Sequence, residues 1–521
     1  MHRRTAISLL ALLVALSAGC GDRPAAPADG TARILLGEPT TLDPAAAGDA
    51  GSAALIAQLF ETLTTFDADR VLRPGLAESW RVEDGGMRVV FVIRDDLRFS
   101  DGSPLEAADV VRSWLRIIDP DTPSPLVTLM SDVRGALAYA RGQGDVEDVG
   151  MRPDDGANEV IVDMLRPGGD FINIVASSTF AVVPAAIDDD PTALVAGDGF
   201  VASGGYRLVG GSATTLDLEA NPAYWAGPPA LGAITLVTDL GGASEVEAFE
   251  DGDLDYASIG SYDASWIAYD ADIGASLREV PSLSTNYYGF DARDAPFDDG
   301  RVRQAFAAAV DWRRIARLSE PDPAAVATSM VPPGIPGRSE ADLVPAYDPD
   351  AGRALLAAAG FPGGAGFPDV VLMTGGTPWD EAVIVELKRE LGVTLRSEVM
   401  DFGSYFDRLD NDPPAMWSLS WVADYPGRND FLGVLLSTGS SNNYGRWSSA
   451  AFDAAIAEAG AAADPVAAGT AYDRAEAIVR DEAPVIPMSY GTGWALSREG
   501  LLGAGQNGMG ILRMAGLAWD D

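Results

Sequence analysis

The sequence predicts an α/β protein with more than one domain. Runs typical of strands are bounded by Asp-Gly and Pro-Gly turns, and stretches typical of helices stand between these runs. The 521 residues, of which 47% are hydrophobic, can supply two or three separate cores. Strands and helices that alternate through a whole chain favour α/β lobes over a helical bundle or a barrel.

The expected strands are short and rich in apolar residues. They cover residues 87–93 (MRVVFVI), 159–164 (EVIVDM) and 215–218 (TLDL). Each stretch alternates or is continuously apolar over four or more positions, which suits a strand that has at least one buried face. We therefore expect a β-sheet with a buried face in each part of the chain that contains one of these strands.

Three helices are expected from apolar residues at three- and four-residue spacing. They cover residues 107–118, 302–316 and 348–359. Asp298 and Asp299 are candidate caps for the second helix, and Gly360 and Pro362 end the third. The glycine run at 363–366 is expected to be a turn, because no helix start follows it.

The amino terminus predicts export. His2, Arg3 and Arg4 precede an apolar run at 6–16, which is too short for the ~30 Å core of a bilayer and is typical of a signal peptide. The following Ser-Ala-Gly and Cys20 resemble a bacterial lipobox, with the leucine one position further from the cysteine than usual. We expect lipidation of Cys20 after cleavage, the alternative being a secreted protein with a spare thiol. Residues 21–30 (GDRPAAPADG) are expected to form a flexible tether.

Charge and composition exclude several classes of protein. The 77 acidic and 36 basic residues give a net charge of −41, which repels nucleic acid. Lys388 is the only lysine. A GC-rich genome and adaptation to saline or alkaline surroundings both explain this composition, and the sequence leaves the choice open.

The sequence offers little for catalysis. His2 and Cys20 are the only histidine and cysteine, so the mature chain has no proton shuttle, no thiol nucleophile, no disulfide and no transition-metal cage. No Gly-rich loop ends in Gly-Lys-Ser/Thr, so no nucleotide cofactor is expected. A pair of carboxylates for glycoside hydrolysis remains open among so many acids. We expect no enzyme, no cofactor and no metal.

A series of segments resembles the large extracytoplasmic solute-binding proteins of peptide ABC importers, known as bacterial solute-binding protein family 5. The segments occur in the order of the family and span nearly the whole chain. They are 38–44 (EPTTLDP), 58–63 (QLFETL), 74–80 (PGLAESW), 91–120 with LRFSDGSP inside it, 203–208 (SGGYRL), 221–225 (NPAYW) and 296–306 (PFDDGRVRQAF). Most of these residues fit turns, caps and core aromatics, such as the tight turn at Asp101 and Gly102.

The resemblance implies a periplasmic-binding-protein-like two-lobe fold of type II, of the large three-domain kind, with a ligand cleft between the lobes. Domain I would be discontinuous, from residues 31–60, 192–285 and 488–521. Domain II would be inserted at 61–191, and domain III, the second lobe, would cover 286–487.

Residues 417–426 (WSLSWVADYP) resemble the segment that pairs with an extended peptide in this family. The resemblance implies that Asp424 receives the ammonium group of the ligand, with Ser420 standing where a glycine is usual. A shielded carboxylate makes a strong hydrogen bond with an ammonium group, and strand addition through main-chain groups tolerates varied side chains. The alternative for Asp424 is a turn residue, and for Trp417 and Trp421 a place in the core. Trp421, Val422, Ala423 and Tyr425 complete this candidate segment.

Other wall residues follow from the resemblance. Asn286 and Tyr287, Tyr490 and Asp49 occupy positions near the ligand in relatives, although Asp49 also fits a helix cap. Trp379 and Ser418 stand where relatives place a basic residue for the ligand carboxylate, and Arg408 is a possible substitute. How a ligand carboxylate is neutralised therefore stays open.

We expect a substrate-binding lipoprotein that captures di- or oligopeptides and delivers them to the permease subunits of an ABC importer. It would be exported, held by its lipid at the outer face of the cytoplasmic membrane, and monomeric, with no nucleic-acid partner. The alternatives are the same fold binding an oligosaccharide or another non-peptide solute, and a ligand sensor without transport.

Overall fold

A computed structural model describes residues 30–520, except 123, 169, 190–193, 195, 198, 281, 320–324, 378 and 463–464. The expected signal peptide, Cys20 and all of the tether except Gly30 lie outside the described residues. Among the described residues, no helix combines the length and the apolar character needed to cross a bilayer.

The described strands form three larger sheets. The first sheet gathers strands from distant parts of the chain, with β1 in parallel contact with β10 and β11. Its strands, in spatial order, are β12 (Leu277–Val280), β18 (Gly493–Ser497), β11 (Tyr256–Ile259), β1 (Ala32–Leu35), β10 (Ala233–Val237), β9 (Thr215–Ala220) and β8 (Tyr206–Gly211). Helices α1 (Ala50–Leu59), α6 (Glu245–Glu250) and α7 (Ser261–Ile267) pack against this sheet, at β8, β11 and β18.

The second sheet is antiparallel and comes from one continuous stretch. Its order is β4 (Ala77–Glu83), β5 (Arg88–Ile93), β7 (Glu159–Asp163) and β6 (Met151–Asp154), with a short ribbon of β2 (Thr64–Phe66) and β3 (Leu72–Pro74) nearby. Its helices are α2 (Ala107–Leu115), α3 (Ala136–Ala140), α4 (Phe171–Ile174) and α5 (Ala186–Asp189). Trp114 of α2 is fully buried against Phe91, Phe171 and Phe180, which fixes the helix on the sheet.

The third sheet has parallel and antiparallel pairs. Its order is β15 (Leu395–Val399), β14 (Val370–Thr374), β16 (Met416–Val422), β13 (Ser284–Phe290) and β17 (Val485–Tyr490). Its helices are α8 (Gly300–Ala309), α9 (Trp312–Ser319), α10 (Pro349–Ala358), α11 (Asp380–Leu391), α12 (Phe402–Asn411), α13 (Ala450–Gly460) and α14 (Pro465–Glu482). A last ribbon, β19 (Leu501–Leu502) with β20 (Ala518–Trp519), lies near the carboxyl end.

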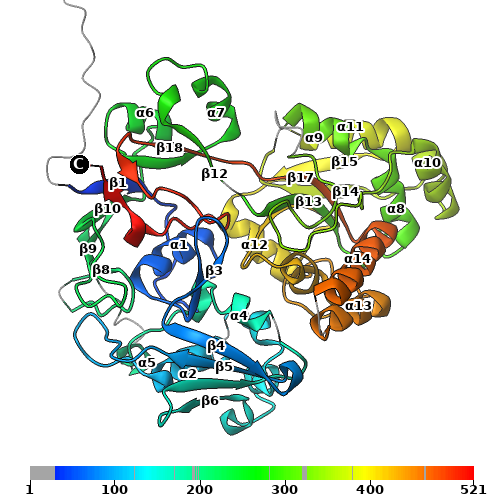
Figure 1. The fold of residues 1–521 in the computed structure, drawn as a ribbon. Coiled ribbons are helices and arrows are strands. Elements are labelled where there is room, and N and C mark those ends of the chain that lie inside the picture. Colours follow the sequence, from blue (N-terminus) through cyan, green and yellow to red (C-terminus); the bar gives the residue numbers. More distant parts are fainter. Residues whose placement is uncertain are drawn as a thin grey trace, which may run out of the picture.

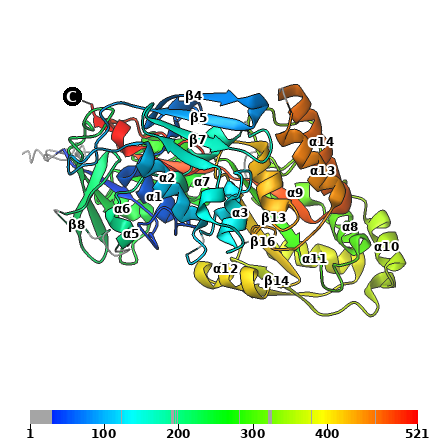
Figure 2. The same cartoon turned by 90° about the horizontal axis from the view of Figure 1, so that it is seen from below.

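Two lobes result from this arrangement. Figures 1 and 2 show the first and second sheets together on one side of the molecule, which we call the first lobe, and the third sheet with its helices on the other, the second lobe. Two segments connect them, one between β12 and β13 and the other between β17 and β18. They run side by side, because Gly491 donates a main-chain hydrogen bond of 3.0 Å to Ser284. The expected two-lobe α/β fold is confirmed.

Most expected elements are confirmed, with small shifts at their ends. The strands at 87–93, 159–164 and 215–218 correspond to β5, β7 and β9, and the helix at 107–118 is α2 followed by a 3₁₀ turn. Asp348 caps α10 by accepting the main-chain N–H of Ala351, and Gly360 follows the helix with a φ of 102°. The glycine run is a turn, in which Gly363, Gly364 and Gly366 all have positive φ.

The prediction of a single helix at 302–316 is wrong. The structure has two helices, α8 and α9, because Val310 is extended and ends the first of them. Asp311 then accepts the main-chain N–H of Arg314, which starts the second helix. The apolar spacing continues through the break, so the periodicity gave no sign of it. Of the two candidate caps, Asp299 caps α8 by accepting the N–H of Arg301.

Gly289 of β13 lies directly under an indole ring of the neighbouring strand. It faces Trp417 of β16, and a methyl group on Gly289 would come within 2.4 Å of the Trp417 ring. We expect Gly289→Ala to destabilise the protein by about 1–3 kcal/mol, because the ring cannot move within a filled core. Urea unfolding measures the loss.

Gly232→Ala is the matched control for this substitution. Nothing lies within 4 Å of a methyl group at Gly232, so its effect should stay within about 0.5 kcal/mol. Equal stabilities of the two variants would contradict the tight contact between Gly289 and Trp417.

Candidate functional site

Strand β16 presents an open edge in the described part of the second lobe. It pairs with β13 along its whole length but with β14 only at Met416 and Trp417. The Ser418 carbonyl accepts the Tyr405 hydroxyl at 2.5 Å, so its main chain is turned away from β13. Main-chain groups alternate in direction along a strand, so those of Ser420 and Val422 point to the same open side.

Asp424 follows this strand and meets a second carboxylate. Its main-chain N–H donates to Asp430 Oδ2 at 3.2 Å, and the indole N–H of Trp421 donates to the same oxygen at 3.0 Å. Asp430 is completely buried, whereas Asp424 is half-buried as a residue but has a buried Oδ2. Asp424 Oδ2 and Asp430 Oδ1 have no hydrogen-bond partner among the described residues. Each of these two buried carboxylate oxygens can therefore accept a hydrogen bond from a ligand.

Burial sets the protonation of this pair. It raises the pKa of Asp424 to about 7. Burial, and after it the nearby charge of Asp424, raises the pKa of Asp430 well above its usual range. A buried carboxylate with no cation beside it prefers the neutral form, so this pair can hold a proton until a cation replaces it.

Around these acids, the two lobes are in contact. The Tyr425 side chain is fully buried and belongs to the apolar cluster that forms the core around β5, β7 and α2 in the first lobe. Trp421 packs against the same cluster while its indole N–H is held by Asp430. The segment that carries Asp424 is therefore enclosed between the lobes.

A buried ion pair supports this segment from behind. Arg428 is 5% exposed and donates to Glu476 Oε1 at 2.5 Å and to Asp473 Oδ1 at 2.7 Å, both on α14. Its guanidinium group also donates to the Gly337 carbonyl and lies 5.2 Å from the ring centre of Tyr472. These contacts fix the loop between β16 and the following helical turn.

A pocket of about 360 Å³ opens inside the second lobe beside the open edge of β16. It lies past the carboxyl ends of β14 and β15, where ligands commonly bind in α/β sheets. The residues that line it are Asn286, Tyr287, Tyr288, Gly375, Thr377, Trp379, Met400, Tyr405, Phe406, Ser418, Leu419, Ser420 and Met488.

Four of the sequence-predicted residues meet at this pocket. Asn286, Tyr287, Trp379 and Ser420 all line it, together with Ser418, which the sequence had placed at a position that is basic in relatives. Ala423 is buried nearby, and Val422 is 44% exposed at the end of the strand.

The structure places the remaining candidates elsewhere. Trp417 is 2% exposed and packs with Met373 and Leu409 in the core. The Tyr490 hydroxyl is engaged by the main-chain N–H groups of Thr328 and Ser329. Both side chains therefore make structural contacts within the second lobe.

Arg408 and Asp49 are also engaged in local contacts. Arg408 is not among the residues that line the pocket and pairs with Asp412 one helical turn away, at 2.9 Å. Asp49 caps α1 by accepting the N–H of Ser52, and its carboxylate also accepts the Thr40 hydroxyl at 2.6 Å. Both arrangements are complete without a ligand.

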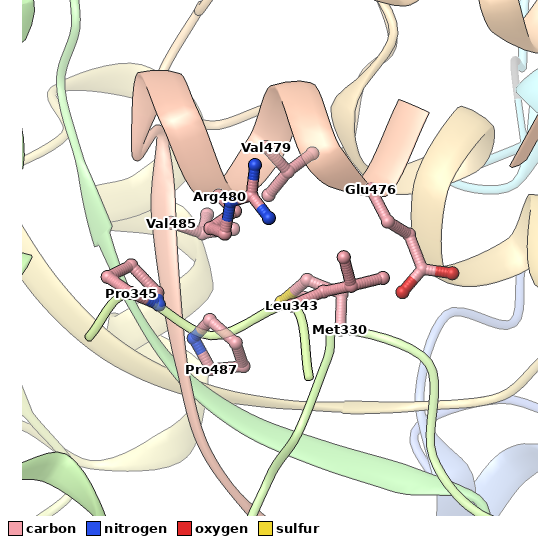
Figure 3. A pocket seen from close by; sticks show the side chains of 8 residues that line it. All are labelled: Met330, Leu343, Pro345, Glu476, Val479, Arg480, Val485 and Pro487. Atoms are coloured by element: carbon pink, nitrogen blue, oxygen red, sulfur yellow. The ribbon is translucent and has the colours of Figure 1, made fainter. Parts of the chain in front are cut away.

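A second cavity is too small for a ligand. It measures about 10 Å³ and lies between α14, which contributes Glu476 and Arg480, and Pro487 of β17 (Figure 3). That volume is about the minimum for one water molecule. Among the described residues, no group of three or more His, Cys, Asp or Glu is arranged to hold a metal ion.

Sequence reasoning missed several residues of the site. Asp430 carried no signal beyond its place in a loop six residues after Asp424. Met400 directly follows β15, Tyr405 and Phe406 lie on α12, and Met488 lies on β17, so only the tertiary fold brings them together. The apolar face of α12 was the one pattern that could have pointed to Tyr405.

Two lobes joined by crossing segments, with an enclosed pair of acids and an open strand edge, define a ligand-binding receptor. The model of the family described as bacterial extracellular solute-binding proteins, family 5, matches residues 71–443. The chain belongs to this family, whose members bind solutes and are not enzymes.

Individual relatives match over almost their whole length. The probable deoxycholate-binding periplasmic protein of Escherichia coli (strain K12) is 28% identical over 94% of this chain and 94% of its own. The periplasmic oligopeptide-binding protein of Salmonella typhimurium is 28% identical over 92% of this chain and 91% of its own. Among solved structures, the Escherichia coli murein tripeptide binding protein has a TM-score of 0.83 and 24% identity, covering 94% of this chain and 98% of its own.

Proposed function

We propose that this protein captures peptides outside the cytoplasm and delivers them to the permease subunits of an ABC importer. The observation that carries the proposal is the enclosed Asp424 carboxylate, which has a buried oxygen without a partner at the end of an open strand edge. Membership of the solute-binding family and the peptide-binding names of several relatives support the same function.

Asp424 is proposed to hold the α-ammonium group of the peptide. The partnerless Asp424 Oδ2 can accept one of the three ammonium N–H groups, and a hydrogen bond between two charged groups is about twice as strong as a neutral one. An ammonium group here would also lower the repulsion between Asp424 and Asp430. The cation thus offsets the cost of two buried carboxylates.

The main chain of the peptide is proposed to extend β16. Ser420 and Val422 offer main-chain donors and acceptors that no strand of the described residues uses on that side. An added strand pairs through backbone groups, so the receptor can accept different side chains at the same positions. This mode of binding accounts for an open edge in an otherwise paired sheet.

Closure of the lobes is proposed to complete the site. Tyr425 and Trp421 lie in the second lobe but pack into the core of the first, so the closed form buries apolar surface that opening would expose. A ligand shifts the lobes only if it binds the closed form more tightly than the open one. The closed surface is what we expect the permease to recognise.

Lipidation of Cys20 and a monomeric state are part of the proposal. The lipid would hold the receptor at the outer face of the membrane, with residues 21–30 as a tether. Mass spectrometry of the membrane-extracted protein tests the lipid, and light scattering tests the oligomeric state.

Acetylation of the peptide amine tests the proposed function. We expect a peptide with a free amine to bind at least about tenfold more tightly than its N-acetyl form, since acetylation removes the charge that Asp424 receives. Isothermal titration calorimetry of the chain without residues 1–20 measures both affinities.

Two variants sharpen this test. Asp424→Asn should remove most of the preference for the free amine, whereas Asp350→Asn, an equal change of charge at an exposed position of α10, should keep it. Equal affinity of wild type for both forms of every peptide, or an unaltered preference in Asp424→Asn, would refute the ammonium site.

A further inference from the structure

The wall of the 360 Å³ pocket carries no charged side chain among its described residues. It is lined by five aromatic residues, by two methionines and by Leu419, together with small neutral residues; the aromatic residues are Tyr287, Tyr288, Trp379, Tyr405 and Phe406, and the methionines are Met400 and Met488. A site of this size falls within the usual range for small ligands, roughly 300–1,000 Å³. Its lining fits an apolar group with the bulk of a ring.

Three hydroxyl groups of this wall are already engaged by protein partners. The Tyr288 hydroxyl donates to Asp380 Oδ1 at 2.6 Å, and the Thr377 hydroxyl donates to Asp380 Oδ2 at 2.5 Å. The Tyr405 hydroxyl is taken by the Ser418 and Met373 carbonyls. The hydroxyl groups of Tyr288, Thr377 and Tyr405 are therefore already engaged by the protein itself.

Neutral polar side chains remain in the lining for recognition, those of Asn286, Ser418 and Ser420. Ser418 Oγ is buried and has no hydrogen-bond partner among the described residues. A hydroxyl can donate one hydrogen bond and accept others, which suits an amide or another uncharged polar group. It cannot neutralise a carboxylate.

A carboxylate in this pocket would meet an unfavourable field. Asp380 is 2% exposed, lies directly behind the Tyr288 and Thr377 side chains, and is itself an acid. Arg408, on the helix that contributes Tyr405, is paired with Asp412 outside the lining. Burial of a charge without a counter-ion is costly, and a second acid nearby adds to that cost.

We propose that this pocket selects an uncharged, apolar, ring-sized group of the ligand and rejects a free carboxylate. The inference rests on the proposed function, because it concerns the part of a peptide that extends from Asp424 along β16 into the second lobe. The preferred ligands are then peptides with an aromatic or large aliphatic side chain whose carboxyl end is amidated or lies beyond the pocket.

Matched peptides test this preference. The probes are alanine peptides of two to five residues with a free amine that end in phenylalanine amide, in phenylalanine with a free carboxylate, or in glutamate amide. We expect the best-binding phenylalanine amide to bind wild type at least about tenfold more tightly than the free acid and the glutamate amide of the same length. Calorimetry at pH 7 measures the three affinities.

A charge introduced into the wall provides the converse test. Ser418→Arg should shift the preference toward the free acid by about tenfold, since a guanidinium group pairs with a carboxylate. Ser418→Ala removes the hydroxyl but adds no charge, so the phenylalanine amide should still bind this variant more tightly than the free acid does. Circular dichroism establishes that each variant is folded, and the wild-type comparison stands on its own if Ser418→Arg is not.

The outcomes separate this inference from the proposed function. Peptides that bind wild type with equal affinity as amide and acid at every length, or more tightly as acids, overturn the pocket preference and leave peptide capture intact. If none of the peptides binds wild type, peptide capture fails and the pocket preference falls with it. A preference for acids in wild type that Ser418→Arg does not change also overturns the inference.

Discussion

Lowering the pH from 7 to 5 is expected to weaken the binding of a free-amine peptide about fiftyfold, about fivefold from pH 7 to 6 and about ninefold from pH 6 to 5. Burial raises the pKa of Asp424 to about 7, so an increasing fraction of the empty receptor carries a proton there as the pH falls. An ammonium group requires the ionised carboxylate and must displace that proton. The ligand amine keeps its charge over this range, because its pKa is about 7.7–8.0.

Calorimetry at pH 5, 6 and 7, in buffers with different heats of ionisation, measures both the affinity and the protons released. Release of a proton per peptide should approach one as the pH falls below 7. Asp424→Asn should lose most of the pH dependence, and affinities of wild type that agree within threefold across the range would contradict the mechanism.

The same groups affect the stability of the empty receptor with a defined sign. The pKa values of Asp424 and Asp430 are raised in the folded chain, which therefore holds protons more tightly than the unfolded chain. The favourable contribution of Asp424 to folding is complete below about pH 4 and is lost as the pH rises through about 7, and that of Asp430 is likewise lost as the pH rises. A bound cation removes this loss by pairing with the ionised form.

Removing the guanidinium group of Arg428 is expected to lower the free energy of unfolding by about 3–5 kcal/mol. Arg428→Met leaves Glu476, which is 2% exposed, as a buried acid without its counter-ion. It also frees the loop that carries Asp424, because the Arg428 contacts to Gly337 and α14 are lost. Urea unfolding measures the change in stability.

The double variant Arg428→Met with Glu476→Met should recover most of that loss, because two apolar side chains can replace a buried ion pair at little cost. Arg474→Ala removes an exposed pair with Glu458 and should change stability by less than about 1 kcal/mol. A loss for Arg428→Met as small as that of Arg474→Ala would show that the buried pair contributes little.

Elements of the fold could be predicted from the sequence where the local pattern of apolar residues agrees with tertiary packing. The continuous apolar run in residues 88–93 forms β5, which is buried on both faces, and the alternation in residues 159–163 forms β7, which is buried on one face. The helix break at Val310 had no local signal, since the apolar spacing of α8 continues in α9. A tertiary contact fixes Asp311 between the two helices, because its main-chain N–H donates to Glu386 Oε2. The order of strands in the third sheet also depends on contacts between residues more than a hundred positions apart.

The candidate site was predictable only in part. Residues of one strand and its following loop, such as Ser420 and Asp424, are found together because they are near in sequence. The apolar wall of the 360 Å³ pocket forms only where the end of β15, α12 and β17 come together in the folded chain. No pattern of residue spacing in the sequence predicts that contact. Arg408 was expected to face a ligand, but helix geometry places Asp412 four residues away, where it makes an ion pair with Arg408.

Lys388, the only lysine of the chain, is exposed on α11 in the second lobe. Amine-reactive dyes can therefore attach at one defined side chain, apart from any free α-amino group. Because Cys20 is the only cysteine, a thiol introduced into the first lobe of protein lacking residues 1–20 gives an equally unique second label. Energy transfer between the two dyes would follow the distance between the lobes during capture, with neither fluorophore touching the cleft.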